Sequence, residues 1–280
     1  MLFLLPPFLI VLFSRGAVSM DYCDKDLCLP QITHIACRNY GVSLESYTIS
    51  IVIAYIFQDF DESCGSGAVI MQFPMNLRAQ LLNVLNDFRN TVALGKHSSF
   101  RPAARMATLR WHKELAGLAK FALRRCENMD DFCSNTHEFK YVSYIYGSSR
   151  WLHREKTPRS IVEFVLKYWM DDMKACTMAH INAERPPKDG QCRGYFTQLV
   201  QDLAAHVGCA MMMRRSHSDG LYQYGLLCQF SRGKIANELV YRESSHPGSR
   251  CYAGTHSTYQ GLCSPEEHVN PNALQLGALN

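Results

Sequence analysis

Two groups of residues in this sequence have the types and the spacing that chemistry would need. The first is Asp202 with His206, because residues four apart on a helix share a face, where a carboxylate could pair with an imidazole. A serine such as Ser143 would complete the three groups of a hydrolase. Such triads are defined by geometry, and the chain lacks a nucleophile-elbow motif. We therefore interpret the pair as an ion pair on the surface of a helix.

The second group is His34 with the nearby Cys28 and Cys37. Cysteine and histidine are the usual ligands of structural zinc. The sequence contains no Cys-x2-Cys pair, however, and paired cysteines of this kind are typical of zinc knuckles. A loop held by disulfide bonds is the favoured interpretation.

Composition indicates an exported chain. Residues 2–13 are apolar and small residues follow at 17–19, which predicts a signal peptide over residues 1–19. The apolar run is too short, and too interrupted by Pro6 and Pro7, for a membrane span of about 20 residues, so we expect no stable membrane insertion. All 12 cysteines follow the predicted cleavage point, and an even number in a secreted chain predicts six disulfides.

Charge excludes one class of partner. Of the 280 residues, 47% are apolar and 19% are charged, which is typical of a globular protein with a substantial core. The net charge is only +4, and no basic stripe interleaved with aromatic residues is present. We therefore expect no nucleic-acid partner.

Helical and strand patterns show which elements must position the candidate groups. Apolar residues at three- and four-residue steps predict helices over residues 74–94 and 112–125. Thr157 followed by Pro158 predicts the start of a third helix, because threonine caps a helix and proline suits its first position. The predicted strands are 139–146, 207–214 and 221–230, the last two joined by a turn at 216–220. Amphipathic helices with late strands predict helices packed on a sheet.

One stretch carries a family resemblance. Residues 194–200 read Gly-Tyr-Phe-Thr-Gln-Leu-Val, and Val-Gly-Cys-Ala follows at 207–210. This resembles the first signature of the CAP superfamily (cysteine-rich secretory, antigen-5 and pathogenesis-related-1 proteins), which begins Gly-His-Phe-Thr-Gln-Met-Val. The cysteine-rich ends resemble insect venom-allergen antigen-5 proteins. The resemblance covers about residues 21–264 and implies an α+β fold, a three-layer α/β/α sandwich with a stapled N-terminal arm and C-terminal tail.

The resemblance also implies the domain organisation and much of the disulfide framework. Residues 20–72 would form a cysteine-rich arm, 73–235 the CAP (SCP) domain and 236–280 a tail. The pairs implied by the resemblance are Cys23–Cys37, Cys28–Cys133, Cys64–Cys126 and Cys209–Cys228. Elimination and short spacing add Cys176–Cys192 and Cys251–Cys263.

In the family, two histidines and two acidic or amide residues line a central cleft, and in some members they bind a divalent cation. The positions that match in this chain are Asp130, Tyr144, Asp172 and Tyr195. Both histidines are replaced, and only Asp172 keeps an acidic character. Zinc needs three or four nitrogen, sulfur or oxygen ligands, and calcium about six oxygens. We interpret the tetrad as degenerate and expect no metal, no cofactor and no catalytic residue.

Residues 42–58 interrupt the family spacing. Without them the arm would read Cys37-Arg38-Asn39-Tyr40-Gly41 and continue at Asp59, as in antigen-5 proteins. The 17 residues correspond to 51 nucleotides (17 × 3), and Val-Ser and Phe-Gln at the two ends can be encoded by splice donor and acceptor sequences. We predict a retained intron. The alternative is a genuine insertion that adds a strand or a hydrophobic contact patch.

These features predict a secreted, non-enzymatic protein that binds an extracellular protein or a small lipid. Two alternatives stay open. One is a divergent copy with little specific activity, and the other is a hydrolase.

Overall fold

The computed structural model describes residues 21–37, 60–65, 67–126, 132–154, 156–182, 191–216 and 219–274. The predicted signal peptide, Asp130 and residues 42–58 lie outside the described residues. Within them, no helix is both long enough and apolar enough to cross a membrane.

Helices and strands alternate along the described chain as far as α4, and a run of helices and then two consecutive strands follow. The strands are β1 (Val69–Met71), β2 (Arg110–Trp111), β3 (Ser143–Trp151), β4 (His206–Arg215) and β5 (Tyr222–Phe230). The α-helices are α2 (Met75–Ala93), α3 (Lys113–Leu123), α4 (Pro158–Asp171), α5 (Met178–Ile181) and α6 (Tyr195–Leu199). The short 3-10 helices are η2 (Glu62–Cys64) and η3 (Asp172–Ala175).

One sheet forms the middle layer. Its order is β1-β4-β5-β3, all antiparallel, and the short β2 pairs with β4 in parallel. Cys209 lies opposite Cys228 in the register of β4 and β5. Because side chains alternate between the faces of a strand, this register places the two sulfurs on the same face. It also leaves β3 as an outer strand, and this edge borders the candidate site.

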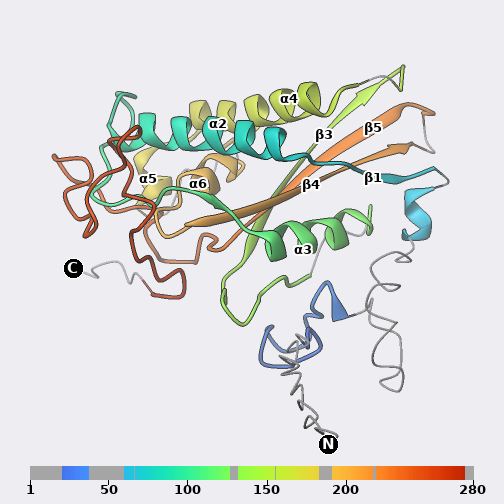
Figure 1. The fold of residues 1–280 in the computed structure, drawn as a ribbon, viewed down its shortest axis with the longest axis horizontal. Helices are drawn as coiled ribbons and strands as arrows, with labels where there is room; N and C mark the ends of the chain where they lie inside the picture. The colour runs from blue at the N-terminus through green and yellow to red at the C-terminus, as the bar shows by residue number, and fades with distance from the viewer. Residues whose placement is uncertain are drawn as a thin grey trace, which may run out of the picture.

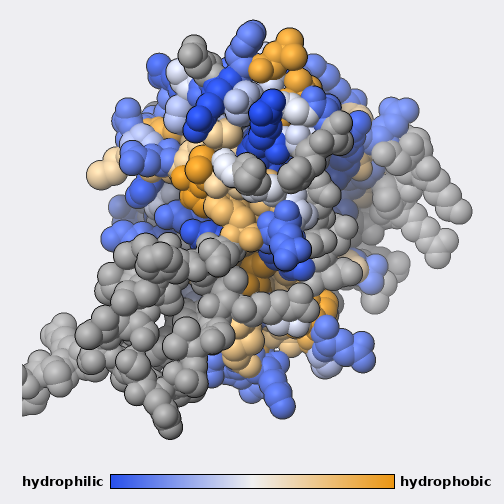
Figure 2. Space-filling model, turned by 90° about the vertical axis from the view of Figure 1, so that its right-hand side faces the viewer, coloured by the Kyte–Doolittle hydropathy of each residue, from blue (hydrophilic) through white to orange (hydrophobic). Residues whose placement is uncertain are grey.

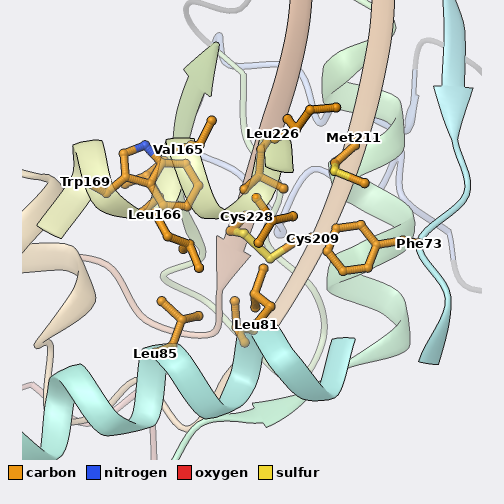
Figure 3. Close-up of a cluster of buried hydrophobic side chains, with 14 of the residues drawn as sticks. Phe73, Leu81, Leu85, Val165, Leu166, Trp169, Cys209, Met211, Leu226 and Cys228 are labelled. Atoms are coloured by element: carbon orange, nitrogen blue, oxygen red, sulfur yellow. A yellow bond between two sulfur atoms is a disulfide. The ribbon is translucent and has the colours of Figure 1, made fainter. Parts of the chain in front are cut away.

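Helices α2 and α4 cover one face of the sheet (Figure 1). Leu81 and Leu85 of α2 and Trp169 of α4 are buried against the inward residues of β4 and β5. Figure 3 shows these side chains around the Cys209–Cys228 disulfide. Each fully buried leucine stabilises the fold by about 2 kcal/mol relative to its exposed state, so the apolar stripe recognised in the sequence positions α2.

Helix α3 covers the opposite face (Figure 1). Its approach to β4 is unusually close at Gly208, where an added Cβ would lie 2.1 Å from the backbone nitrogen of Ala116. Only glycine permits such contact between helix and strand backbones. The three layers confirm the predicted α/β/α sandwich.

Arg89 joins α2 to the chain before β2 and to the end of the signature with the residues that follow it. It is fully buried, and its guanidinium donates hydrogen bonds to the carbonyl oxygens of Ala107, Leu199, Gln201 and Ala204. Burial lowers the pKa of Arg89 to about 9, which still leaves it charged at neutral pH. The segment that carries α6 is thus held at several points.

Six disulfides brace the described chain. They are Cys23–Cys37, Cys28–Cys133, Cys64–Cys126, Cys176–Cys192, Cys209–Cys228 and Cys251–Cys263, the same pairs named from the sequence. Each typically adds about 2–4 kcal/mol of stability, mainly by restricting the unfolded chain.

The sheet end near β1 and the tip of β3 carries exposed apolar side chains. Leu152 is 77% exposed and Val69 is 41% exposed. Figure 2 faces this end and shows hydrophobic residues running down its centre between hydrophilic ones. This surface lies away from the edge of the sheet where α6 meets β3.

Two predicted elements differ from the structure. The strand predicted at 139–146 is β3, which begins at Ser143 and continues to Trp151 because β5 pairs with it over that whole length. The helix predicted around the signature ends at Leu199, so it contains neither Asp202 nor His206. His206 is instead the first residue of β4. The interpretation of these two residues as a helical ion pair is therefore wrong.

Candidate functional site: a cleft at the edge of the sheet

A cleft of about 480 Å³ lies where the α6 segment meets β3. Four consecutive residues of β3, Ser143–Tyr146, line one wall. Arg193, Tyr195 and Gln198 line the other, and Lys234 follows from the loop after β5. Since consecutive strand residues point to opposite faces, a cleft that touches four of them must pass over the outer edge of β3.

Local hydrogen bonds fix the wall formed by α6. Gly194 precedes the helix with φ = 90°, a left-handed conformation that favours glycine. The Thr197 hydroxyl donates to the Gly194 carbonyl oxygen at 3.1 Å. The Gln198 side-chain amide donates to the Arg232 carbonyl oxygen at 2.9 Å, which ties α6 to the loop that carries Lys234.

Asp172 lies behind this wall and does not line the cleft. Its side chain is buried, and its two carboxylate oxygens accept hydrogen bonds from the backbone N–H groups of Arg193, at 2.8 Å, and Phe196, at 3.0 Å. Asp172, the one tetrad position that stays acidic in this chain, thus orients the start of α6. Its lone pairs face backbone donors rather than a cavity ligand.

Tyr195 and Tyr144 both line the cleft. Tyr195 is half-buried against the rings of Tyr168 and Trp169, and burial, followed by the neighbouring Tyr168, raises the pKa of its hydroxyl. Tyr144 stacks on Phe132 with ring centroids 4.7 Å apart. Of the four tetrad positions, the structure therefore brings two tyrosines to the cleft, while Asp172 lies behind it and Asp130 lies outside the described residues.

Three further lining residues were not identified from the sequence: Arg193, Lys234 and Tyr146. Arg193 immediately precedes the signature, and this position could have identified it in the sequence as a residue near the cleft. Lys234 and Tyr146 come from separate segments with no motif. Burial lowers the pKa of Lys234 and raises that of Tyr146, so both groups are partly withdrawn from water.

The proposed triad residues are not gathered in this cleft. Ser143 lines it, whereas Asp202 and His206 do not. The His206 ring instead lies 5.4 Å, between centroids, from each of the rings of His112 and Phe139. Burial, followed by the charges of Arg110 and His112, lowers the pKa of His206 to about 4.

The described residues include one group whose donor atoms are close enough for a metal ion, namely Asp172, Cys176 and Cys192. The two sulfurs form a disulfide, so they are not available as thiolate ligands. His34 is engaged elsewhere. Its Nδ1 accepts from the backbone N–H of Ala36, so its Nε2 carries the proton and donates to the Asn135 carbonyl oxygen at 2.8 Å. The arrangement around His34 is a pinned loop.

Comparison with known proteins agrees with this architecture. A model described as the cysteine-rich secretory protein family, CAP, matches residues 82–230. Venom allergen-1 of Aedes albopictus is 31% identical over 254 residues, which cover 91% of each chain. The antigen 5 like allergen Cul n 1 of Culicoides nubeculosus is 30% identical over 224 residues, covering 76% of this chain and 92% of that protein.

Solved structures share the fold. The crystal structure of NaASP2 with Zn²⁺ aligns with a TM-score of 0.53 at 18% identity, covering 68% of this chain and 96% of the other. Family model, relatives and fold agree, and the chain belongs to the cysteine-rich secretory protein (CAP) family, with insect antigen-5-like relatives.

Proposed function

We propose that this protein is secreted and acts by binding an extracellular protein or a small lipid, without catalysing a reaction. The observation that carries the proposal is the composition of the cleft. Tyrosines, an amide and two cationic side chains line it, and no described lining residue is a carboxylate or an imidazole that could act as a general base.

The frame around the cleft supports a binding role. Six disulfides hold the arm, the sheet and the tail, so surface loops are presented in fixed positions. Pre-organised loops bind with a smaller entropy cost than mobile ones. The relatives named venom allergen and antigen 5 like allergen favour an extracellular setting for this chain.

The experiment uses the secreted full chain with its disulfides intact, immobilised and exposed to extracellular fluid. Captured proteins and solvent-extracted lipids are identified by mass spectrometry and then retitrated as pure compounds. The reduced and alkylated chain is the control. We expect saturable binding of one purified component by the native chain alone. Absence of any such component would favour a divergent copy with little activity.

A separate measurement tests catalysis. A fluorophosphonate probe labels activated serines, and we expect no labelling of the native chain. Labelling of the native chain that disappears in Ser143→Ala would show a hydrolase and would overturn the proposal.

A further inference from the structure

The cleft at the edge of β3 has an unbalanced charge. Arg193 and Lys234 line it, and no described lining residue is acidic. Neither cation has a carboxylate partner within 4.0 Å among the described residues. Arg193 contacts the hydroxyl and the ring of Tyr168, and the Lys234 ammonium donates to the carbonyl oxygen of His180 at 3.4 Å. Two unneutralised cations on one cleft attract an anion.

Among the described residues, the Asp172 carboxylate forms no ion pair with either cation. Asp172 lies behind the α6 wall, and its oxygens accept from the backbone N–H groups of Arg193 and Phe196. Its charge is therefore already stabilised by fixed donors. Arg193 lines the cleft, and the planar fork of a guanidinium suits a carboxylate, phosphate or sulfate group.

The remaining walls suit an aromatic body. Tyr144, Tyr146 and Tyr195 line the cleft together with Ile145, and the Ser143 and Thr197 side chains add hydroxyl groups. Rings with a polar tip can pack against an aromatic ligand while their hydroxyls donate to its oxygens. A volume of about 480 Å³ lies within the range of small-molecule sites, roughly 300–1,000 Å³.

We propose that this cleft binds a small organic anion, with its acidic group held between Arg193 and Lys234 and its aromatic body against the tyrosines. This inference rests on the proposed binding function, because it assigns a ligand class to the cleft. A cleft of this kind prefers negatively charged ligands, whereas a metal site prefers cations.

Phenyl phosphate is the probe. The secreted full chain is titrated by calorimetry with phenyl phosphate, inorganic phosphate and phenyltrimethylammonium at the same ionic strength. We expect saturable binding of phenyl phosphate, weaker binding of inorganic phosphate because it lacks the ring, and no binding of the cation. Equal affinity for the two phosphates would overturn the aromatic part of the proposal, and preference for the cation would overturn all of it.

Variants assign the binding to the cleft. Arg193→Gln and Lys234→Gln should each weaken phenyl phosphate binding roughly tenfold, as the loss of one charge-assisted hydrogen bond predicts. Arg193→Lys and Lys234→Arg keep the charge and should retain most of the affinity. The matched control is Arg159→Gln, an exposed cation on α4 that pairs with Glu163 outside this cleft. Unchanged affinity in both cleft variants would overturn the assignment.

The two proposals fail in different ways. If phenyl phosphate does not bind while the native chain still captures an extracellular component, the anion site is wrong and the binding function stands. If the chain releases phenol from phenyl phosphate, the non-enzymatic function is wrong.

Discussion

At the residue scale, the chemistry of this cleft depends on two tyrosines at tetrad positions, Tyr195 in place of a family histidine and Tyr144 in place of a family Gln or Glu. Tyr195 and Tyr144 line the cleft, and Asp172 directs its oxygens to backbone donors. Neutral imidazole is a good zinc ligand, whereas a phenol whose pKa is raised stays protonated at neutral pH and is a poor one.

We therefore predict that any zinc bound in this cleft has a dissociation constant of ~0.1 mM or higher. The cleft lacks the three or four ligands that a zinc shell needs. Calorimetric titration with zinc tests this. The double substitution Tyr195→His with Asp130→His is the gain-of-function control and should raise the affinity. A micromolar site in the native chain would contradict the prediction.

Asp172 gives a second prediction, on stability. Asp172→Ala leaves the backbone N–H groups of Arg193 and Phe196 without their acceptor. The buried Phe196 donor costs about 1–3 kcal/mol when it is unsatisfied, and the part-buried Arg193 donor costs less because water can reach it. We expect the free energy of unfolding to fall by roughly 2–4 kcal/mol in a denaturant titration. The neighbouring Asp171→Ala is the matched control, because the ion pairs that Asp171 makes with Lys167 and Lys174 lie on the surface. Equal effects at both positions would contradict this interpretation.

At the element scale, the contact of α3 with β4 depends on one glycine. In Gly208→Ala the new Cβ would lie 2.1 Å from the Ala116 nitrogen, and backbone atoms of a packed helix cannot shift independently. In Gly147→Ala the nearest atoms, 2.6 and 2.9 Å away, belong to the side chains of Val165 and Trp169, which can move.

The expected order follows from this difference. Gly208→Ala should cost more than about 3 kcal/mol of unfolding free energy or prevent folding, and Gly147→Ala about 1–3 kcal/mol. Secreted yield and denaturant unfolding measure both. A better-tolerated Gly208→Ala would show that α3 can move away from the sheet.

The junction of β4 with the start of α3 should respond to pH. His206 faces His112, Phe139 and Arg110, and the Glu138 carboxylate lies 3.7 Å from His112 Nε2. The pKa of His206 is about 4 in the folded protein, against 6.5 for an unperturbed histidine. Between these two pKa values the unfolded chain therefore binds more protons than the folded protein. Above pH 6.5 the free energy of unfolding does not change with the titration of His206, and below it the free energy of unfolding declines as the pH falls towards 4.

His206→Gln should flatten this decline in melting temperature between pH 6.5 and 4.5. Part of the slope should remain, because burial also lowers the pKa of His34. The same substitution at the exposed His153 controls for the loss of one histidine. An unchanged slope in His206→Gln would show that other groups dominate the pH response.

At the scale of the whole molecule, disulfides connect the N-terminal arm to the part of the chain that forms the helices and the sheet. Cys28–Cys133 and Cys64–Cys126 attach the N-terminal arm to the chain that follows α3. Ile35 and Ala36 on one side of the segment 38–59, and Phe60 on the other, pack against the same hydrophobic cluster on α3. The described residues on both sides of that segment therefore pack on one surface.

We predict that residues 42–58 are absent from the natural protein. Without them, residues 38–41 and 59 would join Cys37 to Phe60, and such a linker can reach about 20 Å. Sequencing the spliced transcript across codons 35–65 tests this. A chain lacking 42–58 should form all six disulfides and unfold at the same or a higher temperature than the full chain. Peptides containing Ser-Tyr-Thr-Ile-Ser-Ile-Val-Ile in most of the secreted protein would contradict the prediction and favour a genuine insertion.

The sequence by itself determined most of the helices and strands of this protein, and its family resemblance implied how they are layered. Apolar spacing located α2 and α3, and the cap predicted to begin α4 at Thr157 is present, with its side chain accepting from the Ser160 N–H. These features depend on neighbours within one or two turns, so local sequence specifies them. The signature motif identified the family, and the tyrosine in place of its histidine is evident from the sequence.

The tertiary structure alone decided which groups meet. It placed His206 on a strand rather than a helix, extended β3 to Trp151 and turned Asp172 towards backbone donors. It also brought Arg193 and Lys234 to one cleft from segments far apart in the chain. Pairing across a sheet and charge balance in a cleft depend on long-range contacts, and no local pattern encodes them.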